Sequence, residues 1–354
     1  MIAEPTCGSP VAGRFPLRPD FWQLRQSRLI AMKRLLLIPL LVFASHAAQA
    51  HPGHGEDSPL LLAAADNPGT LVTKSALLEN QVSITVEGGY RWIRGNGVPN
   101  HETGQFPGRG NPNRITAQSH VFRVTTSPRT NEVTRDARGA WFGVALNGVP
   151  FEPGTAEFWN GQPEWVMEAK SGFIDLGIDG SNAHVQPTGA YHYHGLPTGL
   201  IKKLGGEGTK MVLVGYAADG FPIYTSWGCS VATNAVSPLK QMRSSWQLKK
   251  GTRDAGPGGM PDGKYTRDYE YVRGSGDLDE CNGRFGVTPE YPNGTYYYCI
   301  TEEFPQLART WRGTPDASFT KRGLGGGLGG RGPGRPGGQG NRPPPPAFGA
   351  PQGR

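Results

Sequence analysis

Two histidines stand one residue apart in residues 189–197, and their spacing suits metal binding. Tyrosines alternate with them, and glycine and proline close both ends of the run, which is typical of a short strand. Side chains alternate along a strand, so His192 and His194 share one face, about 6.5–7 Å apart at the backbone. Two imidazoles at this spacing can converge on one ion, and His184 is the expected third ligand.

Imidazole nitrogens bind zinc, copper, nickel and iron in proteins, and we expect zinc or copper as the cofactor here. Asp219 stands in a predicted turn and is the expected carboxylate partner. It would act as a fourth ligand, or as the acceptor that fixes the tautomer of one imidazole. The alternative is that the histidines only form hydrogen bonds within a polar cluster.

Four blocks of the chain carry a family resemblance, and they follow one another in a fixed order. The blocks are residues 183–195, 219–224, 278–286 and 292–298. They resemble the bacterial YHYH-domain proteins, which are named for the Tyr-His-Tyr-His motif found here at residues 191–194. The resemblance covers roughly residues 80–315. It implies no particular reaction, because the family has no established activity.

The net charge of +7 arises from the two ends of the chain. Residues 1–50 carry +4 and residues 321–354 carry +6, which leaves −3 for residues 51–320. A mildly acidic folded part is not expected to bind nucleic acid. Residues 318–354 are rich in glycine, proline and arginine, and we expect them to form a disordered tail.

Residues 32–50 have the three parts of a secretory signal: a basic start, an apolar run and a small-residue end. The apolar run is too short to span a bilayer, so no transmembrane anchor is expected. We expect Met32 to be the initiator and residues 1–31 to be upstream sequence. The mature protein would then begin at His51 and be periplasmic or secreted. The alternative is a longer, unusual leader.

Three cysteines follow the signal, namely Cys229, Cys281 and Cys299. In an oxidising compartment two of them are expected to pair. Spacing alone does not choose the pair. We favour Cys281–Cys299, because both residues belong to the same C-terminal block.

Short strand patterns between glycine and proline clusters fill the middle of the chain. Residues 82–86 alternate apolar and polar side chains, which predicts a half-buried strand. Residues 120–125 and 141–146 read as strands, and residues 210–216 pair with 221–225 as a hairpin. No long amphipathic helix is evident. The prediction is an all-β fold of mainly short antiparallel strands, a sandwich or barrel-like single domain with long loops.

The YHYH domain is expected at residues 71–317, after a flexible segment at residues 51–70. Within it, Pro-x-Gly-x-Tyr-x-Tyr occurs at Pro187 and again at Pro292. Two pseudo-equivalent strands, which would be neighbours in one sheet, are one explanation. Chance recurrence of tyrosine-rich strands is the other.

The main functional hypothesis is an exported YHYH-family protein that binds a transition metal through its His-x-His strand. One alternative is a metal-free module whose aromatic face binds a glycan or another envelope polymer. We expect those aromatics to lie in the core instead, as strand aromatics usually do. They are Tyr191, Tyr193, Tyr296, Tyr297, Tyr298 and Phe221. The other alternative is a metal-dependent hydrolase or oxidase.

Overall fold

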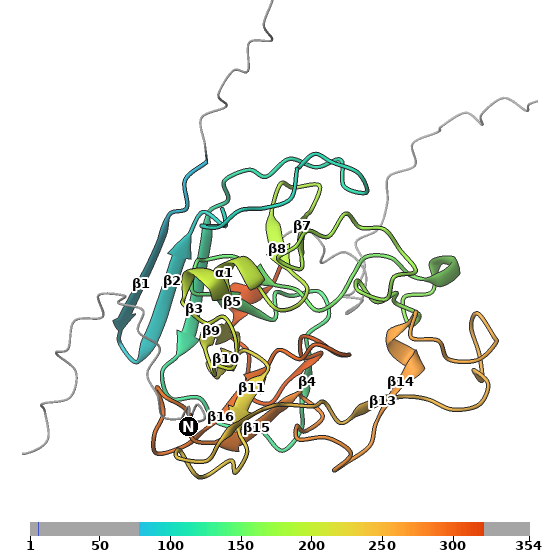
Figure 1. The fold of residues 1–354 in the computed structure, drawn as a ribbon. Coiled ribbons are helices and arrows are strands. Elements are labelled where there is room, and N and C mark those ends of the chain that lie inside the picture. Colours follow the sequence, from blue (N-terminus) through green and yellow to red (C-terminus); the bar gives the residue numbers. More distant parts are fainter. Residues whose placement is uncertain (1–5, 7–77, 322–354) are drawn as a thin grey trace, which may run out of the picture. The chain divides into compact units, whose positions relative to one another are not determined.

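The computed structural model describes Thr6 and residues 78–321 (Figure 1). The expected upstream sequence, signal segment and N-terminal segment, and all but the first four residues of the expected tail, lie outside the residues described. Between residues 78 and 321, no helix has the length and apolarity that a membrane crossing requires.

Short strands make up most of the regular structure, and the predicted all-β class is confirmed. The first strands are β1 (Val82–Glu87), β2 (Tyr90–Gly95), β3 (His120–Thr125), β4 (Arg135–Asp136), β5 (Gly143–Ala145), β6 (Pro150–Phe151), β7 (Ala183–Val185) and β8 (Tyr191–Tyr193). The later strands are β9 (Leu213–Ala217), β10 (Pro222–Tyr224), β11 (Trp227–Cys229), β12 (Leu239–Gln241), β13 (Trp246–Leu248), β14 (Tyr269–Tyr271), β15 (Gly283–Gly286), β16 (Thr295–Cys299) and β17 (Thr310–Trp311). The described helices are α1 (Thr198–Lys203) and the 3₁₀ turns η1 (Trp159–Gly161), η2 (Thr266–Asp268) and η3 (Ala317–Phe319).

An eight-stranded sheet carries the candidate site, and its strand order is β15-β16-β10-β9-β5-β6-β8-β7. Most of its pairings are antiparallel, as expected, but β8 runs parallel to β6 and β16 runs parallel to β10. The expected hairpin of β9 and β10 is present, with its turn at Asp219 and Gly220. Gly220 has a φ of 94°, a conformation that glycine adopts without strain.

A separate three-stranded sheet contains β1, β2 and β3. Its first strand corrects one expectation, because β1 is not half-buried. Ile84 and Val86 point their apolar side chains to an exposed face. The alternating pattern found the strand correctly, but β1 is an edge strand that pairs only with β2. Alternation therefore does not tell whether another layer covers the apolar face.

The eight-stranded sheet is built from two equivalent halves. One half contains β5 to β8 and the other contains β9, β10, β15 and β16. They meet where β5 pairs antiparallel with β9, and Val144 stands opposite Tyr216 at the centre. Each half has an inner hairpin followed by an outer strand pair, and the second outer strand returns parallel to the hairpin.

The turns before β7 and β15 match down to their hydrogen bonds. Asp179 Oδ1 accepts from the backbone N–H groups two and four residues further on, at 2.8 and 3.2 Å. Asp279 Oδ1 makes the same two contacts at 3.0 and 3.1 Å. Asn182 and Asn282 both adopt the left-handed conformation that asparagine tolerates. The two outer strand pairs therefore begin from one kind of turn.

The repeated Pro-x-Gly-x-Tyr pattern marks the equivalent strands β8 and β16. Their equivalence is confirmed, but they are not neighbours, because four strands lie between them. His194 and Cys299 occupy matching places: each donates its backbone N–H to the left-handed asparagine of its own turn. The six aromatics that were expected in the core are all buried.

The cysteines differ from the expected pairing. Cys281 and Cys299 are both free thiols buried in the protein. Cys229 is disulfide-bonded. The Cys281 thiol contacts Thr310 Oγ1, whereas Cys299 belongs to a buried hydrophobic cluster with Cys229 and Tyr224, so proximity in sequence was a poor guide.

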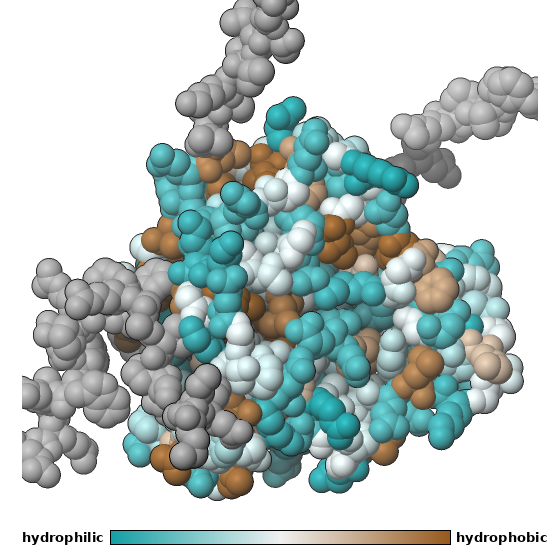
Figure 2. Space-filling model, in the orientation of Figure 1, coloured by the Kyte–Doolittle hydropathy of each residue, from teal (hydrophilic) through white to brown (hydrophobic). Residues whose placement is uncertain are grey.

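Polar residues cover much of the surface that Figure 2 shows, and hydrophobic residues gather there in several separate places. Strand Tyr side chains and Phe142, Phe151 and Ile223 fill the interior beneath. Burying side chains of this size contributes about 1.5–3 kcal/mol each. The sheet that carries the histidines is thus a rigid support.

Candidate metal centre

Antiparallel pairing of β7 with β8 brings the three predicted histidines together. His184 stands directly opposite His192, and His194 follows two residues later on the same face. The three pairs of ring centroids are 4.7, 4.8 and 4.7 Å apart. Each residue offers one ligand atom, and these atoms all lie within 4.8 Å of one another.

Backbone carbonyls fix the tautomers of two of the imidazoles. His184 Nδ1 lies 2.8 Å from the carbonyl oxygen of Leu176, and His192 Nδ1 lies 3.2 Å from that of Ala190. A carbonyl only accepts, so Nδ1 of each ring carries the proton and donates. The Nε2 lone pair of each ring is then free to bind a metal.

His194 is the most unusual side chain of the three. It is 4 % exposed, and neither of its ring nitrogens has a hydrogen-bond partner among the residues that the structure describes. A neutral imidazole has one donor and one acceptor, so both are left unsatisfied. A buried polar group without a partner costs about 1–3 kcal/mol, so something that binds His194 would recover this free energy.

Burial keeps the three rings neutral. It lowers the pKa of His192 to about 3, and the neighbouring His184 lowers that pKa further. The pKa of His194 is well below its ordinary value, first through burial and then through the other two histidines. Burial also lowers the pKa of His184. Neutral imidazole is the form that binds metals, so the site is ready for an ion at neutral pH.

The family model described as YHYH protein matches residues 121–313, more than half of the chain. The chain belongs to the YHYH protein family. The matched range holds both halves of the eight-stranded sheet and the histidine triad of this YHYH protein. No curated protein and no solved structure matches the chain.

Glu152 is a further side chain beside the triad of the YHYH protein, and sequence reasoning missed it. It follows β6, whose parallel pairing with β8 gives a bond from Glu152 N to the carbonyl oxygen of Tyr193. Its Oε2 atom lies 3.5 Å from His192 Nε2. His192 is neutral with a pKa of about 3, so the two side chains do not form an ion pair. No local pattern reveals a contact made across two parallel strands.

Two further side chains hold the Glu152 carboxylate in place. Gln186 donates to Oε2 at 2.6 Å, and Lys321 pairs with Oε1. The Lys321 ammonium also lies 4.3 Å above the ring of Trp141, which packs on His192. The carboxylate beside the triad is thus oriented from two sides.

Asp219 is not among the side chains that converge with the triad. It is 1 % exposed, and its Oδ2 atom accepts from Tyr298 Oη at 2.5 Å and from Gly313 N at 2.8 Å. Burial raises its pKa to about 6. The expectation that it binds the ion or orients an imidazole does not fit, because main-chain carbonyls orient the imidazoles. Its block in the family pattern is explained by the β9–β10 turn instead.

Proposed function

We propose that this YHYH protein is exported and binds one transition-metal ion, zinc or copper, through its histidine triad. The ligand atoms are Nε2 of His184, Nε2 of His192 and one ring nitrogen of His194. Three protein nitrogens leave a further coordination position, as in zinc sites that keep water or another ligand there. Glu152 supplies the negative charge beside the cation.

The observation that carries the proposal is the pair of unsatisfied nitrogens on buried His194. A cluster held together only by hydrogen bonds would give each ring a partner for both nitrogens. His184 and His192 instead use Nδ1 to contact backbone carbonyls, which leaves both Nε2 lone pairs free, and His192 Nε2 lies 3.5 Å from Glu152 Oε2. A cation shared by three lone pairs accounts for all of these features at once.

The test is the metal content of protein purified without chelators or a histidine tag, measured by elemental mass spectrometry. We expect one zinc or copper ion per chain, and none in His194→Ala. His120→Ala is the matched control, since His120 Nε2 is also buried and without a hydrogen-bond partner but lies outside the triad. Wild-type protein that stays free of metal after incubation with either ion would refute the proposal.

Export rests on the signal-like residues 32–50, which combine a basic start, an apolar run and a small-residue end. N-terminal sequencing of protein from the secreted or periplasmic fraction tests this part separately. We expect the first residue to be His51. Protein that is found only in the cytosol would exclude export and leave the metal proposal standing.

A metal-dependent hydrolase or oxidase is the second candidate, and Glu152 favours it. Catalytic metal sites combine an open coordination position with a nearby acid–base group, and Glu152 is the carboxylate beside His192. Glu152→Gln should keep the bound metal and lose any hydrolysis of activated esters that the wild type shows. The aromatics that would form the face of a metal-free glycan module are buried, which disfavours that alternative.

A further inference from the structure

The two halves of the sheet differ in what covers their outer strand pair. In the first half, Asp179 Oδ2 accepts from Tyr191 Oη at 2.8 Å and from the backbone N–H of Gly104 at 3.0 Å. The ring of Phe106 packs edge-on against Tyr191, with centroids 6.0 Å apart. A Gly-x-Phe segment of the chain therefore caps this Asp–Tyr pair.

The same covering segment continues along β7. Asn111 and Asn113 each donate a side-chain N–H to the carbonyl oxygen of Val185, at 3.0 and 2.8 Å. Val185 is 1 % exposed as a result. In this half, residues 104–113 thus cover the outer face, with a tight turn closed between Gly108 and Asn111.

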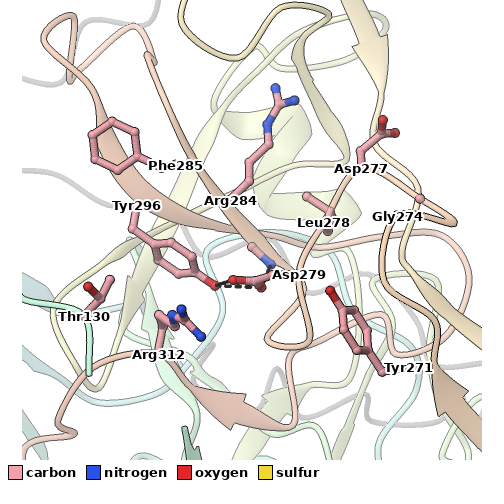
Figure 3. Close-up of a pocket in the computed structure, with 12 residues that line it drawn as sticks. Thr130, Tyr271, Gly274, Asp277, Leu278, Asp279, Arg284, Phe285, Tyr296 and Arg312 are labelled. Atoms are coloured by element: carbon pink, nitrogen blue, oxygen red, sulfur yellow. Dashed lines mark hydrogen bonds between the residues drawn. The ribbon is translucent and has the colours of Figure 1, made fainter. Parts of the chain in front are cut away.

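The second half has the same Asp–Tyr pair, and no segment within residues 78–321 caps it as residues 104–106 cap the first. Asp279 accepts from Tyr296 Oη at 2.9 and 3.0 Å, as Figure 3 shows. Phe285, which takes the place of Val185 in the strand register, is 61 % exposed. The Asp279–Tyr296 pair and Phe285 line an open cleft of about 520 Å³. Its lining also includes Tyr271, Leu278 and Arg312.

Arg312 shows where the equivalence of the two halves ends. Its backbone N–H donates to Tyr298 Oη at 2.7 Å, just as His101 Nε2 contacts Tyr193 Oη in the first half. Its guanidinium pairs with Glu280, at 2.7 Å. Among the described residues, only Tyr296 donates to Asp279 Oδ2.

We propose that this cleft binds an extended peptide segment of a partner protein in the manner of residues 104–106. A backbone N–H of the peptide would donate to Asp279 Oδ2, and an aromatic side chain two residues later would pack between Tyr296 and Phe285. Peptide recognition commonly combines hydrogen bonds to the peptide main chain with pockets for individual side chains. The proposal is independent of metal binding, because no triad residue lines the cleft.

The charges in the cleft favour a neutral, aromatic peptide over an ionic ligand. Asp277 pairs with Lys240, and Arg284 donates to Tyr297 Oη and to the carbonyl oxygen of Cys229. The charged groups are therefore largely paired within the protein. What remains available is the second carboxylate oxygen of Asp279 and the exposed ring of Phe285.

The probe is a labelled peptide with the sequence of residues 99–109, titrated into the mature protein and followed by fluorescence anisotropy. We expect saturable binding. Alanine in place of the peptide phenylalanine should weaken it about tenfold or more, since loss of an aromatic contact is worth at least 1.4 kcal/mol. A peptide that does not bind, or that binds equally well without its phenylalanine, would overturn the proposal.

Phe285→Ser is the test on the protein side, because its exposed side chain contributes little to folding. It should weaken peptide binding about tenfold and leave metal content and melting temperature unchanged. Met260→Ser, at an exposed apolar residue that does not line the cleft, is the matched control and should bind normally. Stronger binding of neutral oligosaccharides, lost in Phe285→Ser, would identify a glycan cleft and reject the peptide.

Discussion

At the scale of single residues, the two faces of β8 have different roles in the proposed metal centre. His192 lies on the face of the proposed ion, while the ring of Tyr193 packs against Phe151 and its hydroxyl contacts His101 and Asn147. Metal affinity and core packing are therefore assigned to alternate residues of one three-residue strand. Substitution of a histidine should therefore remove the stabilisation by metal, whereas substitution of Tyr193 should lower stability with or without metal.

We predict that His192→Ala and His194→Ala abolish the rise in melting temperature that zinc or copper gives to the wild type. An ion that binds only the folded chain adds about 4 kcal/mol at a thousandfold excess over Kd. Tyr193→Ala should lose about 3–5 kcal/mol with or without metal, because it removes a fully buried ring. Thermal melting of the three variants checks this. Histidine variants that melt like the wild type with and without metal would show that these residues do not bind the ion.

Protonation should act on the metal-free protein through the same histidines. The pKa of His192 is about 3 in the folded protein and near 6.5 in the unfolded chain, so the unfolded chain binds more protons between these values. The contribution of neutral His192 to the free energy of unfolding is fully present above pH 6.5. It is lost as the pH drops toward 3, by about 1.4 kcal/mol for each pKa unit of difference. Urea unfolding at pH 7 and pH 5 measures the loss, and His192→Gln should reduce it.

The low pKa values also change the expected route of metal release. Ordinary histidines would be protonated near pH 5 and free the ion. Here burial lowers the pKa of His192 to about 3, so its ring stays neutral at that pH, and burial also lowers the pKa of His194 well below its ordinary value. We therefore expect the ion to stay bound at pH 5 and to leave only when the protein unfolds, which gel filtration with metal analysis would show. Release at pH 5 from protein that remains folded would contradict this.

At the scale of elements, local patterns predicted much of the site but not its surroundings. The alternation in β8 put His192 and His194 on one face, and the turn between β7 and β8 brought His184 opposite. Glu152 was out of reach, because its position depends on a parallel pairing between strands about 40 residues apart. Asp219 was predicted as a ligand because a carboxylate in a turn is a typical metal ligand. Its oxygens instead accept hydrogen bonds from Phe221 N in its own turn and from Tyr298 Oη.

Asp219→Asn separates these two roles. The carboxylate accepts three hydrogen bonds, and Oδ2 alone receives those from Tyr298 and Gly313. An amide has only one oxygen, so its NH2 group would face the N–H of either Gly313 or Phe221, and we expect a loss of about 1–3 kcal/mol in the free energy of unfolding. Metal content should stay at the wild-type level. Loss of metal from a folded Asp219→Asn protein would restore Asp219 as a ligand.

At the scale of the whole molecule, one sheet contains two halves with one architecture and different chemistry. The register places Arg284 where His184 stands and Tyr297 where His192 stands, and the matching backbone bonds to the turn asparagines place Cys299 where His194 stands. The pattern of tyrosines revealed this duplication only in part, because the repeated turns and hairpins share few residue types. The two halves resemble each other mainly in their backbone hydrogen bonds, which nearly any side chain permits.

The second half should not bind metal, so the protein should take up one ion per chain and not two. Arg284 is always protonated, and its guanidinium occupies the place of a ligand while donating to Tyr297 Oη at 2.6 Å. Burial raises the pKa of the Cys299 thiol to about 12, which keeps it protonated and unable to act as a thiolate ligand.

Cobalt substitution tests this difference between the halves directly. We expect one cobalt ion per chain with nitrogen and oxygen ligands and no thiolate charge-transfer band, because no cysteine belongs to the triad. Cys299→Ser should leave both the stoichiometry and the spectrum unchanged, whereas His194→Ala should lose the ion. Two equivalents of cobalt, or a thiolate band that disappears in Cys299→Ser, would show that the second half also binds metal.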